Sequence, residues 1–160
     1  MGYPQPANLL GVLALFVRHG GLRAVLIHRL AGWSARKRLA GLPSLLCNFN
    51  LAAHGFDVPP SVPIGPGFYL PHPGAVVIQA NRIGRDVTVQ GSITIGMRDS
   101  TGFPTIGNDV FIGCGARILG SITVGDGARI GANAVVLVDV PPGCTAVGVP
   151  ARIIRPRTNE

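Results

Sequence analysis

The chain has 160 residues, of which 47% are hydrophobic and 13% are charged, and its net charge is +7 at pH 7. This composition describes a single globular domain with a real core and excludes a disordered chain. The 23 glycines and 14 prolines are interleaved with Ile and Val, and this mixture predicts many short strands with frequent turns.

The first third of the chain is basic and has the pattern of helices. Residues 1–57 contain six Lys or Arg side chains and one acid, Asp57. Glycines and Pro43 interrupt the apolar pattern and predict helices over 8–18, 21–39 and 43–53. Apolar residues of the second helix recur at helical spacing, namely Leu22, Val25, Leu26, Leu30 and Trp33.

We expect this apolar stripe to pack on the adjoining domain and to leave the basic side chains in water. Peripheral contact with an anionic membrane is the alternative. No RNP pattern or helix-turn-helix is present, so nucleic acid is not an expected partner. The apolar run LLGVLALFV follows no basic region and has only nine residues, so we expect neither a signal peptide nor a membrane span.

The three cysteines, Cys47, Cys114 and Cys144, show no CxxC spacing. Neither a disulfide framework nor a zinc site is indicated, so no metal is expected. A reducing, cytoplasmic location fits this pattern best.

Branched residues stand six apart through the rest of the chain. The unbroken run is Ile106, Ile112, Ile118, Val124, Ile130 and Val136, and the same period passes through Val77, Ile83, Val89 and Ile95, and through Val58, Ile64 and Leu70. A period of six is typical of a parallel β-helix. Three hexapeptides then close one coil of a triangular prism, and coils stack about 4.8 Å apart with the branched residues inside.

Two breaks in this period mark irregular places. The spacing from Ile95 to Ile106 is eleven, which predicts a protruding loop over 97–105, where sites are often built. A one-residue slip before Val77 falls beside His72 and predicts an irregular corner. We therefore expect a helical segment over 1–55, a β-helix domain over 56–144 and a C-terminal extension over 145–160.

The segments GFDVPPSVPIGPGFYLPH and GARILGSITVGDGARIGANAVVLVDVPPGCTAVGVPARI carry a resemblance. From Phe56 to Arg152 the chain resembles the catalytic part of the serine acetyltransferases, hexapeptide-repeat enzymes that move an acetyl group from acetyl-CoA to a hydroxyl. The resemblance implies a mainly β fold, a left-handed parallel β-helix of hexapeptide repeats with a short α-helical N-terminal segment, and an acyltransferase activity with no metal.

By the same resemblance, His72 is the general base and Asp57, fifteen residues earlier, is its carboxylate partner. An alcohol attacks a thioester only if a base takes its proton as the bond forms. A carboxylate on the other ring nitrogen fixes the tautomer of that base. Fifteen residues lead nearly once around the prism, so we expect the two side chains to come close on adjacent strands.

The resemblance also implies that acetyl-CoA binds in a groove between subunits of a homotrimer, while trimer and hexamer both stay open. The matching positions are Gly96, Met97, Cys114, Arg129, Ala132 and Arg152. The two arginines are suited to the phosphates, and a backbone N–H near Gly96 is suited to the oxyanion.

Two substrate-binding positions depart from the family pattern. Serine acetyltransferases have an acid before the base and a second histidine in the loop, where this chain has Pro71 and Phe103. Together with the short helical segment, this favours relatives from colanic acid and exopolysaccharide biosynthesis, and a sugar hydroxyl as the acceptor. Serine or a small amino alcohol is the alternative acceptor, and a scaffold protein is the alternative without activity. A zinc carbonic anhydrase would need several histidines in the coils, where only His72 lies.

Overall fold

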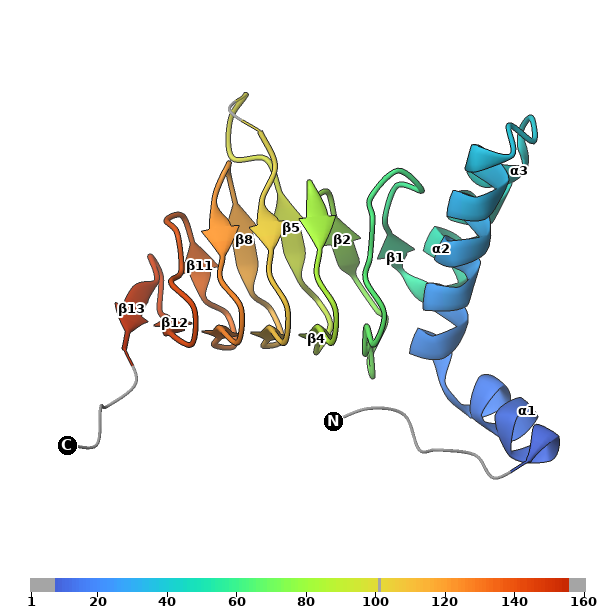
Figure 1. Ribbon diagram of the computed structural model, residues 1–160, viewed down its shortest axis with the longest axis horizontal. Coiled ribbons are helices and arrows are strands. Elements are labelled where there is room, and N and C mark those ends of the chain that lie inside the picture. Colours follow the sequence, from blue (N-terminus) through green and yellow to red (C-terminus); the bar gives the residue numbers. More distant parts are fainter. Residues whose placement is uncertain (1–7, 101, 156–160) are drawn as a thin grey trace.

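Three helices begin the chain in the computed structural model, which describes residues 8–100 and 102–155 (Figure 1). They are α1 (Leu9–Arg18), α2 (Gly20–Arg36) and α3 (Leu42–His54), close to the ranges predicted from the sequence. Gly41 and Gly55 flank α3 with positive φ angles of 77° and 60°, a conformation that glycine adopts without strain. None of the described helices is both long enough and apolar enough to cross a membrane.

Thirteen short strands follow the helices in the part of the chain that the structure describes. They are β1 (Phe56–Asp57), β2 (Val76–Ile78), β3 (Arg82–Ile83), β4 (Thr88–Val89), β5 (Thr94–Gly96), β6 (Thr105–Ile106), β7 (Phe111–Ile112), β8 (Arg117–Leu119), β9 (Thr123–Val124), β10 (Arg129–Ile130), β11 (Val135–Val136), β12 (Thr145–Val147) and β13 (Arg152–Ile154).

These strands form three sheets that the chain visits in turn. Sheet A has the order β1-β2-β5-β8-β11, sheet B the order β3-β6-β9, and sheet C the order β13-β12-β10-β7-β4. Every strand pair is parallel except β12 with β13. Three strands therefore complete one coil, and the coils stack along one axis with the helices beyond β1 (Figure 1). The predicted hexapeptide coil is confirmed.

The branched residues at six-residue spacing fill the interior. From Ile83 to Val136 the predicted residues are at most 3% exposed. The predicted register fails one strand earlier, because Ile78 is buried and pairs with Ile95 while Val77 is only half-buried. The coil from Asp57 to its partner Val77 holds twenty residues instead of eighteen. The chain therefore returns to sheet A two residues later than in a regular coil.

The segment between β5 and β6 leaves the stack where the sequence predicted a loop (Figure 1). The Asn81 side-chain Nδ2 donates a hydrogen bond to the Phe103 carbonyl oxygen at 2.8 Å and fixes the end of this loop. At the other end of the chain, β12 still pairs in parallel with β10, so the coil continues past the expected boundary at 144.

The helix α2 packs through a different face from the one predicted. Its buried residues are Gly21, Ala24, Val25, His28, Ala31, Gly32 and Ser34, whereas Leu26, Leu30 and Trp33 are 39%, 54% and 49% exposed. Small residues allow a close approach, since a Cβ at Gly32 would lie 3.3 Å from the Pro60 carbonyl oxygen. The prediction that the stripe packs on the adjoining domain is therefore wrong for Leu26, Leu30 and Trp33, whereas Val25 of the same stripe is buried in the core.

A buried histidine fastens α2 to the first coil. His28 is 5% exposed, and its Nε2 donates to the Val62 carbonyl oxygen at 3.2 Å. Burial lowers the pKa of His28, so the neutral ring is favoured in the folded chain.

Candidate active site

His72 lies at the edge of the prism where sheet C meets sheet A. Just before it, Tyr69 bridges Thr88 in sheet C, and just after it, Val76 begins β2 in sheet A. The His72 side chain is exposed and lines a cavity of about 440 Å³, here called the His72 hollow. The other lining residues are Gly74, Ala75, Gln90, Gly91, Ser92 and Cys114. The base predicted from the sequence is thus open to a ligand.

Gly91 lets the next coil approach the His72 backbone closely. A Cβ at Gly91 would lie 2.4 Å from the His72 carbonyl oxygen, and the φ angle of Gly91 is +114°. Both the contact and the φ angle exclude a side chain at this position without movement of the backbone.

We expect Gly91→Ala to displace His72, because the clash is with backbone atoms that cannot rotate away. The variant should unfold at a lower temperature by an amount that corresponds to about 1–3 kcal/mol, and it should lose any activity that depends on His72. Gly74→Ala is the matched control, since a Cβ at Gly74 meets nothing within 4 Å. An equal melting temperature for the two variants would contradict the role given to Gly91.

Two of the predicted acetyl-CoA positions continue the edge on which His72 lies. Going along the stack, Gly91 is followed by Cys114 and Ala132, one coil at a time, because Gly115 N donates to the Gly91 oxygen and Asn133 N donates to the Cys114 oxygen. Cys114 and Ala132 are both exposed. Three coil spacings separate Ala132 from His72, about 14 Å. This edge therefore offers a long, accessible line to an extended ligand.

Asp57 does not meet His72 in the single chain. Among the described residues, no hydrogen bond or ion pair joins the two side chains. Asp57 pairs with Val77, five residues beyond His72, and lies on sheet A instead of at the edge. The pKa of the Cys47 thiol on α3 is raised by burial first and by the negative charge of Asp57 second. The predicted contact is not formed here, because the corner before β2 carries His72 away from sheet A.

The predicted site residues in and beside the protruding loop lie at a different edge of the prism. Gly96 ends β5, and the exposed Met97 begins the protruding loop at the edge between sheets A and B. Phe103 closes that loop. Sheet A separates these three residues from His72, whereas Pro71 is its neighbour and is half-buried. One chain thus carries His72, Cys114 and Ala132 on one edge and Gly96, Met97 and Phe103 on another.

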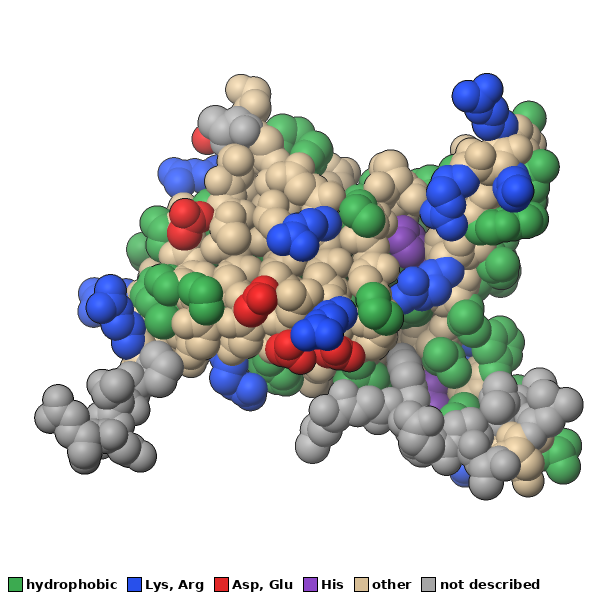
Figure 2. Space-filling model, in the orientation of Figure 1, with side chains coloured by type: hydrophobic (Ala, Val, Ile, Leu, Met, Phe, Trp, Pro, Cys, Tyr) green, Lys and Arg blue, Asp and Glu red, His purple; other side chains and the backbone are tan. Residues whose placement is uncertain are grey.

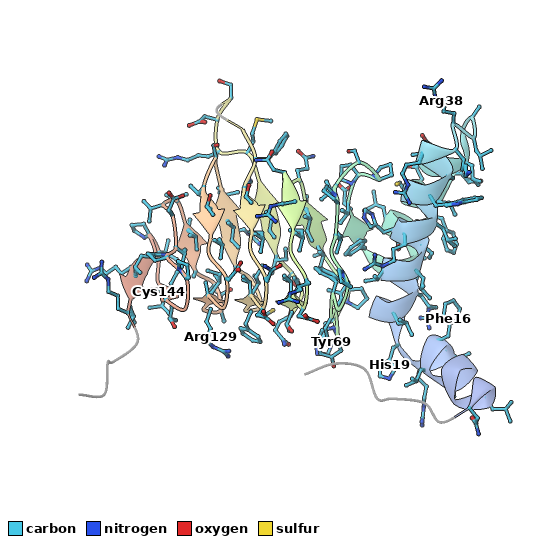
Figure 3. All side chains as sticks on the ribbon, in the orientation of Figure 1. Phe16, His19, Arg38, Tyr69, Arg129 and Cys144 are labelled. Atoms are coloured by element: carbon cyan, nitrogen blue, oxygen red, sulfur yellow. The ribbon has the colours of Figure 1, made fainter. Side chains whose placement is uncertain are left out.

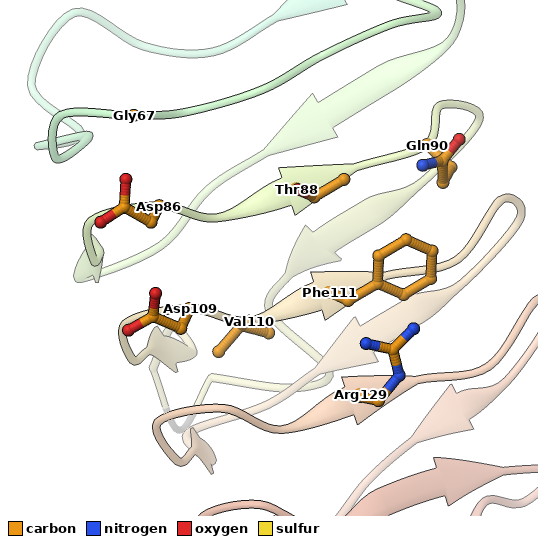
Figure 4. A pocket seen from close by; sticks show the side chains of 8 residues that line it. All are labelled: Gly67, Asp86, Thr88, Gln90, Asp109, Val110, Phe111 and Arg129. Carbon is orange, nitrogen blue, oxygen red and sulfur yellow. The ribbon is translucent and has the colours of Figure 1, made fainter. Parts of the chain in front are cut away.

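Arg129 lies on the outer face of sheet C and points away from the prism (Figure 3). Its guanidinium lies 4.7 Å from the centroid of the Phe111 ring, a cation–π contact. Arg129 and Phe111 line a cavity of about 420 Å³, and Asp86 and Asp109 line the same cavity (Figure 4). These carboxylates oppose a phosphate here, so the structure does not favour the predicted phosphate contact of Arg129.

Gln90 lines both this cavity and the His72 hollow, so the two adjoin. Arg152, the other predicted phosphate ligand, is exposed on β13 at the far end of the stack. The sequence reasoning missed Gln90, Gly91 and Ser92. Gly91 follows His72 by nineteen residues, which is the spacing of the neighbouring Tyr69–Thr88 pair, so the coil register would have found them.

Comparisons with known proteins agree with this geometry. A family model described as bacterial transferase hexapeptide (six repeats) matches residues 103–137. A serine acetyltransferase of Helicobacter pylori strain J99 is 40% identical over 158 residues, covering 94% of this chain and 89% of that protein. The chain belongs to the serine acetyltransferase family of hexapeptide transferases.

Solved structures of the family have the same fold. The serine acetyltransferase of Neisseria gonorrhoeae in complex with serine has a TM-score of 0.82 and 34% identity over 92% of this chain. The enzyme of Brucella abortus strain S19 in complex with coenzyme A has a TM-score of 0.83 and 32% identity over 94% of this chain. This chain spans 62% of the length of each, and 62% of a Synechococcus elongatus relative that is 37% identical to it.

Proposed function

We propose that the protein transfers an acetyl group from acetyl-CoA directly to the hydroxyl of serine, with His72 as the general base. The observation that carries this proposal is the exposed His72 at the head of the edge that continues through Cys114 and Ala132. Membership of the serine acetyltransferase family supports it. From the same family we infer that the three-sheet coil is left-handed.

The proposed reaction needs one proton acceptor and one site for negative charge. The acceptor oxygen attacks the thioester carbonyl while His72 takes its proton, which gives a tetrahedral intermediate. As the intermediate collapses, the C–S bond breaks, and the imidazolium returns the proton to the CoA thiolate. A backbone N–H near Gly96 is the proposed donor to the oxyanion. Asp57 keeps its predicted role as the partner that orients His72, although the single chain does not show their contact.

Serine is favoured over a sugar as the acceptor. The relatives named above are serine acetyltransferases, and one of them binds serine. They do not support the exopolysaccharide branch that the short helical segment and the residues Pro71 and Phe103 indicated. Pro71 and Phe103 still differ from the charged and histidine residues of the family pattern. Other residues must therefore bind the ammonium and carboxylate groups of serine.

The acceptor is tested by release of the CoA thiol. We expect kcat/KM for L-serine to exceed that for nucleotide sugars and oligosaccharides by on the order of 10²-fold or more, because a site built for two charged groups rejects ligands that leave them unpaired. A higher kcat/KM for a sugar than for L-serine would favour the sugar as the acceptor. It would not change the proposal that acetyl-CoA is the donor.

We propose a homotrimer with its sites between chains. Gly96, Met97 and Phe103 lie at one edge and His72 at another, so a neighbouring chain is needed to bring a loop over the His72 hollow. A threefold ring has three identical interfaces. Each interface would join the loop edge of one chain to the His72 edge of the next.

The shared site is tested by mixing inactive chains. His72→Ala chains are coexpressed with chains that lack residues 98–102, and each variant alone should be inactive. In mixed trimers roughly a quarter of the interfaces join an intact His72 edge to an intact loop, so activity should return to about that level. Mixed trimers without activity, or an active monomer in light scattering, would contradict the proposal.

A further inference from the structure

The helices expose an apolar surface that none of the described residues covers. Ten of the fourteen large hydrophobic side chains that the described residues expose lie between residues 10 and 51. Leu26, Leu30 and Trp33 form a stripe on α2, and α3, which packs along α2, exposes Leu45 and Phe49. We call these five residues the outer helical surface. Patches of this kind in a folded protein mark places where something binds.

Positive charge accompanies this surface. Residues 1–56 contain six Lys or Arg side chains and no acid. The visible face of the helical end shows hydrophobic and basic side chains and no acidic one (Figure 2). Arg29 and Arg36 follow one another on α2 at a spacing of seven, next to the stripe, and Lys37 and Arg38 come directly after the helix.

Arg29 and Arg36 also line a cavity of about 390 Å³ between the helix and the first coil. Arg29 is held in place there, because its guanidinium donates to the carbonyl oxygens of Ile64 and Gly65 at 3.4 and 2.8 Å. Arg36 makes no hydrogen bond or ion pair with any described residue. Ser61 adds a hydroxyl to the lining. The cavity thus offers a fixed cation, a free cation and a donor to an anionic group.

A second copy related by a twofold axis is a poor partner for this surface. A twofold contact places the same patch on both sides, so Arg36, Lys37 and Arg38 would face their own copies, and residues 1–56 supply no acid to pair with them. Like charges across an interface oppose association. The partner must instead supply apolar area together with negative charge.

An anionic bilayer supplies both. Leu and Phe side chains can enter the boundary between headgroups and acyl chains, Trp prefers this interface, and Lys and Arg meet the lipid phosphates. We propose that the outer helical surface docks the protein on an anionic phospholipid membrane, with a lipid phosphate at Arg29 and Arg36. This surface lies on one chain and is separate from the His72 hollow, so docking does not depend on the proposed acetyl transfer.

The test is cosedimentation with vesicles of phosphatidylcholine alone and of phosphatidylcholine mixed with phosphatidylglycerol. The full chain should sediment only with the anionic vesicles, and added salt should release it, because ions screen the attraction of surface charges. Arg36→Gln/Lys37→Gln/Arg38→Gln should weaken binding on the order of 100-fold, about fivefold for each charge near the surface. Leu30→Ser/Trp33→Ser should also weaken it, since less apolar area enters the bilayer.

The matched controls lie on the β-helix. Val138→Ser removes an apolar side chain that is 53% exposed, and Arg155→Gln removes an exposed charge; both should bind like the unmodified protein. The proposal fails if the unmodified protein sediments with neither vesicle or equally with both. It also fails if the controls lose binding as much as the helix variants. An assembly whose mass halves in Leu30→Ser/Trp33→Ser without lipid would show that a second copy covers the surface, and this would overturn the proposal as well.

Discussion

His72→Ala should lower kcat/KM for acetyl transfer on the order of 10²–10⁴-fold, the contribution expected of a general base. The side chain is exposed and lies at a corner outside the buried core, so its removal should change neither the circular dichroism spectrum nor the melting temperature. The measurement is thiol release at saturating acetyl-CoA with L-serine varied. Full activity in this variant would remove His72 from the mechanism.

Asp57→Asn tests whether Asp57 acts as the partner of the base. Because the variant keeps the base and changes only the group proposed to orient it, we expect a smaller loss than in His72→Ala. The substitution keeps the size of the side chain and removes its charge. A loss as large as that of His72→Ala, with the double variant no worse than either, would show that assembly brings the two residues together as one unit.

The β-helix could be predicted because branched residues recur every six positions in the sequence. From Ile83 onward each predicted anchor is buried, since three hexapeptides close a coil and repeat the same environment. The error at Val77 arose where the coil holds twenty residues. The next coil, from Ile78 to its partner Ile95, holds seventeen residues, so Ile78 stands five residues before Ile83 instead of six. The six-residue period of the sequence therefore points to Val77 instead of its buried neighbour.

The packing face of α2 could not be predicted from its amphipathic pattern. The stripe of Leu26, Leu30 and Trp33 has the helical spacing of a core face, yet the face with Ala24, Ala31 and other small residues is the buried one. Small side chains gain little by burial but permit close packing of backbones. The amphipathic pattern thus identified a continuous apolar stripe but assigned it to the buried face of the helix.

The positions of site residues in the regular coils could be predicted from the repeat. The positions of those in the irregular first coil could not. Cys114 and Ala132 fall on the same edge as His72, because equivalent positions of successive coils stack. The expected contact of Asp57 with His72 depended on the irregular first coil and is absent from the single chain. The residues Gln90 and Ser92, which the repeat brings to the His72 hollow, became evident only when the register was known.

The second large effect expected is on stability, at the centre of the interior column. Ile118 is fully buried in β8 and pairs with Ile95 of the coil before it and Val136 of the coil after it. Ile118→Ala leaves a cavity between these two neighbours, which short, hydrogen-bonded strands cannot close. We expect a loss of about 2–5 kcal/mol in the free energy of unfolding. Denaturant unfolding at one fixed protein concentration measures it, because an oligomer unfolds in a concentration-dependent way.

Val138→Ala is the matched control, since this side chain is 53% exposed and should change the free energy of unfolding by no more than about 0.5 kcal/mol. In a stack of coils each coil contacts only its neighbours, so a cavity at Ile118 should act mainly on β5 and β11. His72, in the first coil, should keep its position. We therefore expect Ile118→Ala to retain most of its kcat well below its lowered melting temperature. If its kcat fell as far as that of His72→Ala under those conditions, the coils would be coupled more strongly than their pairing implies.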